Sequence, residues 1–146
     1  MTLHIFGSNS IGPGTRVDLQ ITDEAFVSQG VTVASTDGRA IIGDGSFHVV
    51  EVAGTVFGDY SAIWLGNDSA VDSFQRVLIG QNAYVGSTGY TVALQGQNST
   101  AVNRGMVSGL IGFFMGGVGD DQSNLTNFGT ITGELDAILR IEGSTE

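Results

Sequence analysis

Hydrophobic residues in this chain recur in short alternating runs that are separated by polar residues and glycine. Segments such as RVDLQIT (16–22), GVTVAS (30–35) and GYTVALQG (89–96) show the two-residue period of half-buried strands. No segment keeps the 3.6-residue period of an amphipathic helix over several turns. The pattern therefore predicts an all-β protein with many short strands and frequent turns.

The runs also form a repeat. A small residue, a variable residue and an aliphatic residue return together at intervals of 25, 29, 22 and 24 residues. We take the aliphatic residue as the anchor of each repeat. The anchors are Val31, Val56, Val85, Val107 and Ile131. Periods in this range are typical of stacked structural repeats.

Other positions follow the anchors at fixed distances. The residues six positions before the anchors are all apolar: Ala25, Val50, Ile79, Ala101 and Leu125. Seven positions after the last four anchors lie Ile63, Val92, Phe114 and Ile138, and Ile41 fits the first repeat with a shift. Two residues of a strand that are six positions apart point to the same face, whereas two that are seven positions apart point to opposite faces. For both positions to face the interior, the chain must turn a corner between the anchor and the residue seven positions after it. The glycine that often lies two residues after the anchor is expected to form this corner through a positive φ angle.

These columns predict a single-domain parallel β-solenoid, a right-handed β-helix with about five coils of 22–29 residues in residues 23–146. Residues 1–22 precede the coils and form either a leading partial coil or a cap. Asn103 and Asn127 fall in one column, where a side-chain amide ladder is expected. A glycine-rich β-sandwich or jelly roll also has short, regularly spaced strands, and it stays as the alternative fold.

The interval of 29 residues indicates an insertion of about five residues, which we place in GNDSAVDSFQ (66–75). Trp64 lies just before this segment and Phe74 lies within it. Loops that protrude from solenoids often bind partners, so Trp64 and Phe74 are candidate contact residues. The alternative is a bulge that the coil accommodates.

The apolar segment GLIGFFMGG (109–117) supplies two more candidates for partner contact. Phe114 falls in the interior column, so Phe113 and Met115 are expected to point outward as a contact surface. Curvature at the corner would instead bury either of them.

Several motifs resemble a known group of proteins. NRGMVSG (103–109), NFGTITG (127–133) and AIWLG (62–66) resemble the repeats of bacterial extracellular right-handed β-helices, over roughly residues 24–143. Such repeats occur in autotransporter passengers and in type I-secreted proteins that carry calcium-binding nonapeptides. The resemblance implies an extracellular or cell-surface location and an adhesive or structural role. It also implies leaderless export, since residues 1–14 lack the features of a Sec signal peptide.

Charge and composition limit the classes of partner that the chain is expected to bind. Fifteen acidic residues and five arginines give a formal net charge of −10, which disfavours nucleic acid as a partner. No apolar run approaches the roughly 20 residues of a membrane-spanning helix, so membrane insertion is not expected. The chain has no cysteine and hence neither disulfides nor thiolate metal sites.

The segment GGVGDD (116–121) has the opening pattern of a calcium-binding nonapeptide. Asp120 and Asp121 are therefore candidate calcium ligands, together with nearby backbone carbonyl groups. A calcium-binding roll needs several consecutive repeats and this chain has one, so a solvated glycine-rich corner is the alternative.

The sequence leaves the question of enzymatic activity open. His4 and His48 are far apart, and no residues show the spacing of a catalytic triad or of a metal site. The last coil is expected to end within a few residues of Ile141, and nothing that resembles a capping helix follows it. An uncapped solenoid exposes strand edges that invite association. We therefore expect a non-enzymatic, extracellular structural solenoid that self-associates into fibres or a surface structure. The alternative is a β-helix that binds or cleaves carbohydrate, with a glycan as its ligand.

Overall fold

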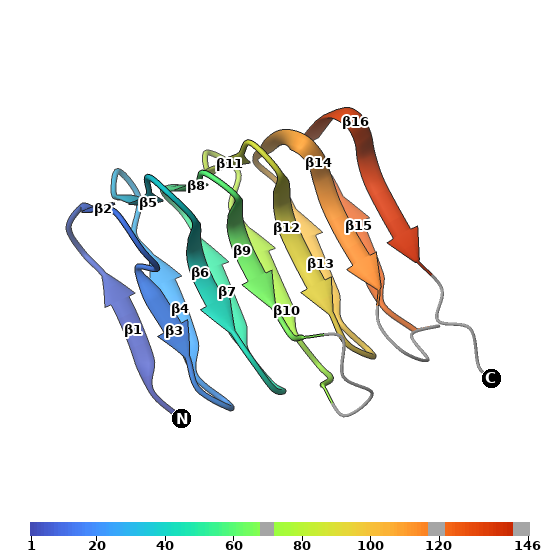
Figure 1. Ribbon diagram of the computed structural model, residues 1–146, viewed down its shortest axis with the longest axis horizontal. Coiled ribbons are helices and arrows are strands. Elements are labelled where there is room, and N and C mark those ends of the chain that lie inside the picture. Colours follow the sequence, from blue (N-terminus) through green and yellow to red (C-terminus); the bar gives the residue numbers. More distant parts are fainter. Residues whose placement is uncertain (68–71, 117–121, 142–146) are drawn as a thin grey trace.

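The chain winds into a β-solenoid in which successive coils stack along one axis (Figure 1). The computed structural model describes residues 1–67, 72–116 and 122–141. Within these ranges there are sixteen strands and no helix, and so none long or apolar enough to cross a membrane. Every strand pairing in this part of the chain is parallel, which confirms the predicted solenoid and contradicts the antiparallel sandwich.

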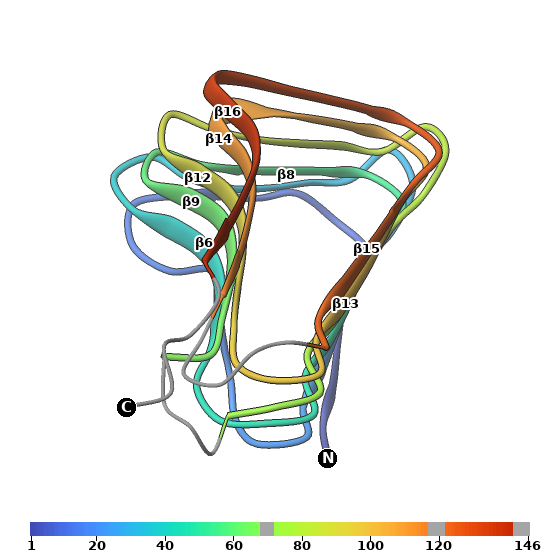
Figure 2. The ribbon, with the colours of Figure 1, turned by 90° about the vertical axis from the view of Figure 1, so that its right-hand side faces the viewer.

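Three faces make up each coil (Figure 2). The first face contains β1 (Leu3–Phe6), β4 (Glu24–Val27), β7 (Val49–Val52), β10 (Arg76–Ile79), β13 (Thr100–Asn103) and β15 (Asn124–Asn127). The second contains β2 (Ser10–Gly12), β5 (Thr32–Ser35), β8 (Thr55–Gly58) and β11 (Tyr84–Ser87). The third contains β3 (Val17–Leu19), β6 (Arg39–Gly43), β9 (Ser61–Leu65) and β12 (Tyr90–Gln95). The long strands β14 (Met106–Gly116) and β16 (Thr130–Ile141) continue through the second and third faces.

The winding is right-handed. Viewed from the C-terminal end in Figure 2, the chain turns counterclockwise as it advances toward the viewer. This is the hand that parallel crossover connections favour. Strands β1, β2 and β3 pair with β4, β5 and β6, so residues 3–19 form a leading coil.

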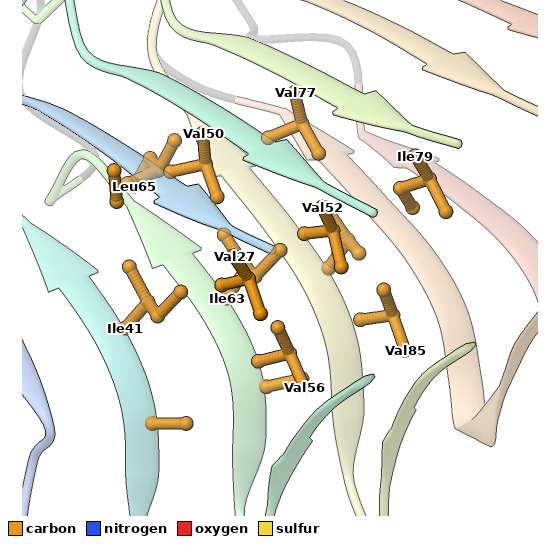
Figure 3. Close-up of a cluster of buried hydrophobic side chains, with 14 of the residues drawn as sticks. Val27, Ile41, Val50, Val52, Val56, Ile63, Leu65, Val77, Ile79 and Val85 are labelled. Atoms are coloured by element: carbon orange, nitrogen blue, oxygen red, sulfur yellow. The ribbon is translucent and has the colours of Figure 1, made fainter. Parts of the chain in front are cut away.

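Aliphatic side chains fill the interior (Figure 3), and the strand register stacks them in columns along the solenoid axis. The anchor column of the second face consists of Val33, Val56, Val85, Val107 and Ile131. The prediction of Val31 was therefore wrong by two residues, and Val77 takes the place expected for Ile79 on the first face. In both coils the connection between the first two strands has four residues instead of two (28–31 and 80–83). Two extra residues leave the following side chains pointing in the same directions as before. The alternation of apolar residues therefore did not reveal the longer connections.

The expectation that Phe113 and Met115 point outward was wrong. Phe113 pairs with Val92 in the interior column and is 0% exposed, whereas Phe114 points outward and is only partly buried. Met115 is also buried. The cause is a shorter corner, because Phe113 lies six positions after Val107 whereas Val92 lies seven positions after Val85. Removing one residue reverses which side chains face the interior.

The glycines two residues after the anchors do form corners, but not through positive φ. Among the described residues, the glycines with positive φ are Gly14, Gly30, Gly45, Gly66 and Gly96. A Cβ atom at Gly58 or Gly133 would instead overlap the carbonyl oxygen of Ser61 or Asp136. These corners therefore require glycine because the backbone folds closely onto itself.

The asparagine ladder is confirmed. The Asn103 Nδ2 atom donates to the Asn127 Oδ1 atom at 2.8 Å, and Asn103 Oδ1 accepts from the backbone N–H of Gly105 at 3.0 Å. Asn103 is fully buried, and these bonds satisfy the side-chain amide in the interior.

Candidate binding surfaces

One side of the solenoid carries a cluster of aromatic residues that we call the aromatic face. It consists of Arg39, Tyr60, Trp64, Tyr90 and Phe114. The chain has a single tryptophan and three tyrosines, so this cluster gathers the tryptophan and two of the tyrosines. Trp64 and Phe114 share one outward register position on the third face.

The rings contact one another across three successive coils. The centroid of Tyr90 lies 5.9 Å from Trp64 and 5.4 Å from Phe114, both in edge-to-face geometry. Tyr60 lies 6.1 Å from Trp64 and 6.4 Å from Tyr90. These separations are within the range in which aromatic pairs attract each other.

Arg39 occupies the adjacent coil and covers two of the rings. Its Cζ atom lies 4.0 Å from the centroid of Trp64 and 5.2 Å from that of Tyr60, which is cation–π geometry. In the part of the chain that the structure describes, the Arg39 guanidinium has no carboxylate partner. The hydroxyl groups of Tyr60 and Tyr90 have no hydrogen-bond partner among the same residues.

Local sequence positions these side chains. Tyr60 lies in the corner that precedes β9, and Tyr90 begins β12. Ala93 lies between Trp64 and Phe114 in the register and is 0% exposed, so its small side chain leaves room for the larger rings around it. Tyr60 is 48% exposed, whereas Trp64, Tyr90 and Phe114 are partly buried.

The sequence pattern identified only Trp64 of this cluster. The sequence holds only a weak indication of the other members. Tyr60 and Tyr90 each follow a turn residue, Asp59 or Gly89, at or just before the start of a third-face strand. Arg39 follows Gly38 in the same way. Their proximity depends on which coils stack, and this information is not local in the sequence.

Phe74 forms a separate exposed pair. Its ring stacks on Phe47 with a centroid distance of 5.2 Å and an interplanar angle of 11°, and both rings are about half exposed. Phe47 and Phe74 both have positive φ, at 65° and 58°, and they lie in the corner column that also contains Thr22 and Asn98. This backbone conformation is unusual for a bulky residue.

The connection that contains Phe74 is long, as the interval of 29 residues predicted. Ten residues (66–75) join β9 to β10, whereas four or five residues join the third-face strand to the next coil at 20–23, 44–48 and 96–99. Residues 68–71 of the connection lie outside the described residues.

The two ends of the solenoid form a second kind of surface. Ile138 continues the interior column of Val92 and Phe113, yet it is 50% exposed because no coil among the described residues covers it. A hollow of about 290 Å³ at this end is lined in part by Met115, Leu125 and Ile138. At the opposite end, Phe6 and Val17 end their columns only partly buried.

The candidate metal ligands Asp120 and Asp121 lie outside the described residues. Within residues 1–67, 72–116 and 122–141, no group of three histidine, aspartate or glutamate side chains is arranged to hold a metal ion. The calcium prediction therefore stays a prediction.

Asp23 is the buried carboxylate with a perturbed pKa. Burial by itself raises the pKa of Asp23, but hydrogen bonds from the backbone N–H groups of Thr2 and Gln20 and from His4 together lower the pKa below its ordinary value of 3.8. The N–H of Thr2 donates to Asp23 Oδ1 at 2.6 Å. Asp23 thereby ties the leading coil to the next one, which is a structural role.

Comparison of the chain with protein families, with curated proteins and with solved structures found no match.

Proposed function

We propose that this β-solenoid is a structural module that associates end to end, as the subunit of an extracellular fibre or surface structure. The observation that carries the proposal is the exposure of the hydrophobic columns at the C-terminal end. Ile138 is 50% exposed, whereas Phe113, directly before it in the column, is 0% exposed. Covering this column with another coil would remove apolar surface from water, which is favourable.

The strand edges support the same contact. β15 and β1 each have four residues and belong to the same sheet at its opposite ends. An exposed strand edge offers unpaired N–H and C=O groups to another chain. If β1 of a second copy continues the register beyond β15, Val17 of that copy falls above Ile138 in one column.

Such a contact joins two different surfaces of the same protein. Contacts of this kind leave one free surface of each sort on every assembly, so they propagate into filaments unless the rotation closes a ring. The proposal therefore predicts linear assemblies whose length increases with protein concentration.

Sedimentation velocity over a concentration series, combined with negative-stain microscopy, tests this proposal. We expect the wild-type chain to form linear assemblies and Ile138→Glu to abolish them, because the substitution places a charge at the end of the column. Leu135→Glu is the matched control, since Leu135 is 69% exposed on the same strand but has no partner in the register with β14.

Two results would contradict the proposal. The first is a monodisperse monomer at the highest concentration that the wild-type protein reaches. The second is assembly that Ile138→Glu leaves intact while its circular dichroism spectrum shows a folded solenoid.

A further inference from the structure

We propose that the aromatic face binds a neutral linear glycan, with the exposed ring of Tyr60 as the stacking surface and Arg39, which is held over Trp64, as a hydrogen-bond donor. The aromatic face lies on the side of the solenoid, on β6, β9, β12 and β14 and the corner before β9. It is separate from the two ends, so this inference does not depend on the proposed association.

The rings of the aromatic face do not contribute to the hydrophobic core. The interior columns of these coils are filled by aliphatic residues and Phe113, and the rings of the aromatic face lie outside the sheet. The face of an aromatic ring that remains half exposed offers apolar surface to a ligand. Tyr60 is 48% exposed at the rim of the cluster.

The free polar groups are the second observation. Among the described residues no arginine forms an ion pair, and Arg39 is the arginine that lies over two aromatic rings. Its guanidinium is held over Trp64 and Tyr60 by the rings, which leaves its five N–H donors available. The hydroxyl groups of Tyr60 and Tyr90 are likewise without partners in this part of the structure.

Sugars match this combination of groups. A pyranose ring has apolar C–H faces that stack on aromatic rings, and a rim of hydroxyl groups that needs donors and acceptors. Binding sites in general combine apolar and aromatic walls with a few placed polar groups. In the aromatic face, the exposed ring of Tyr60 supplies the apolar surface, and Arg39 and the phenol hydroxyls supply the polar contacts.

The arrangement along the axis favours an extended ligand. The aromatic face runs from β6 to β14 across four stacked strands, a span of about 14 Å at a strand spacing of about 4.8 Å. This length accommodates several sugar units of a linear chain that lies along the solenoid axis.

Charge favours a neutral ligand. The formal net charge of −10 repels polyanions, and the exposed carboxylates Asp37 and Asp59 lie in the corner segments beside Arg39 and Tyr60. The same argument disfavours nucleic acid, whose affinity for proteins depends on neutralisation of its phosphates by basic residues.

The single tryptophan makes a direct binding assay available. Because Trp64 is the only tryptophan, its fluorescence emission reports on the aromatic face alone. We would titrate the protein with hydroxyethylcellulose, galactomannan, xylan and dextran, and measure gel retardation in the same polysaccharides. We expect at least one of them to shift the Trp64 emission and to retard the protein. Tyr60→Ala and Arg39→Gln should each weaken that binding roughly tenfold or more.

The matched controls are Arg104→Gln and Phe128→Ala. Arg104 covers the ring of Phe128 at 4.8 Å, which is the same kind of contact at a different corner. These two variants should keep the affinity of the wild type. Thermal unfolding followed by circular dichroism verifies that Tyr60→Ala and Arg39→Gln remain folded.

Three outcomes would overturn the inference. One is the absence of both an emission shift and retardation with every neutral polysaccharide. Another is binding that Tyr60→Ala and Arg39→Gln leave unchanged in folded protein. The third is a response only to alginate and polygalacturonate, or only to a proline-rich peptide, which would assign the aromatic face to an acidic glycan or to an extended peptide.

Discussion

Asp23 shows how one residue stabilises the start of the solenoid. Its carboxylate accepts hydrogen bonds from the backbone N–H groups of Thr2 and Gln20, and it lies 3.5 Å from His4 Nε2. Because these bonds lower the pKa of Asp23 in the folded state below 3.8, the ionised carboxylate favours folding. Two segments of the chain, 2–4 and 20–23, are held together at this one side chain.

The pKa shift of Asp23 predicts a dependence of stability on pH. The stabilisation is fully present above pH 3.8, the ordinary pKa, and is lost as the pH falls through the lower pKa of the folded state. We therefore expect Asp23→Asn to lower the melting temperature at pH 7, and the difference from the wild type to shrink below pH 3.8. Differential scanning calorimetry at several pH values measures this effect.

Asp18→Asn is the control for that experiment, because Asp18 is an exposed carboxylate on the same leading coil. Its melting temperature should follow that of the wild type at each pH. A loss of stability in Asp23→Asn that is the same at pH 3 and pH 7 would show that the charge of the carboxylate plays no part.

At the level of elements, β14 shows how one corner decides which ring is buried. The corner between Val107 and Phe113 is one residue shorter than the corresponding corner between Val85 and Val92. Phe113 consequently enters the interior column, and Phe114 joins the aromatic face.

The two adjacent phenylalanines give a matched test of this register. Phe113→Ala should lower the free energy of unfolding by about 3–5 kcal/mol, because it leaves a cavity in a close-packed interior. Phe114→Ala should cost much less, since its ring is only partly buried. Urea denaturation of both variants measures the difference. Equal losses, or a larger loss for Phe114→Ala, would contradict the register of β14.

At the scale of the whole molecule, net charge governs how copies approach each other. Each copy carries a formal charge of −10, so two copies repel at low ionic strength. Salt screens this repulsion, with a Debye length of about 8 Å at 0.15 M ionic strength. The apolar contact at the ends does not weaken under the same conditions.

The proposed association should therefore become stronger as salt increases. Sedimentation velocity between low ionic strength and 0.5 M sodium chloride would follow it, and the fraction of protein in assemblies should rise. A fall in that fraction would indicate a contact held by ion pairs instead of by the hydrophobic columns.

The architecture follows from the amino-acid sequence, because the repeat depends on which way each side chain points from its strand. Inward residues recur on the same face of each strand, and this periodicity predicted a solenoid, the ladder of Asn103 and Asn127, and the long connection 66–75. Corners that differ by two residues, as before Val33, leave the inward side chains pointing inward. The predicted fold was therefore correct although the anchor was placed two residues away.

The residues that form the surfaces could be identified from the three-dimensional fold but not from the sequence pattern. The corner in β14 differs by a single residue, which reverses inside and outside, so the sequence pattern placed Phe113 on the surface and Phe114 in the core. The aromatic face depends on non-local stacking, since Arg39, Trp64 and Tyr90 come from three different strands. Alternation along one strand specifies which way a side chain points, whereas its neighbours are set by the register between coils.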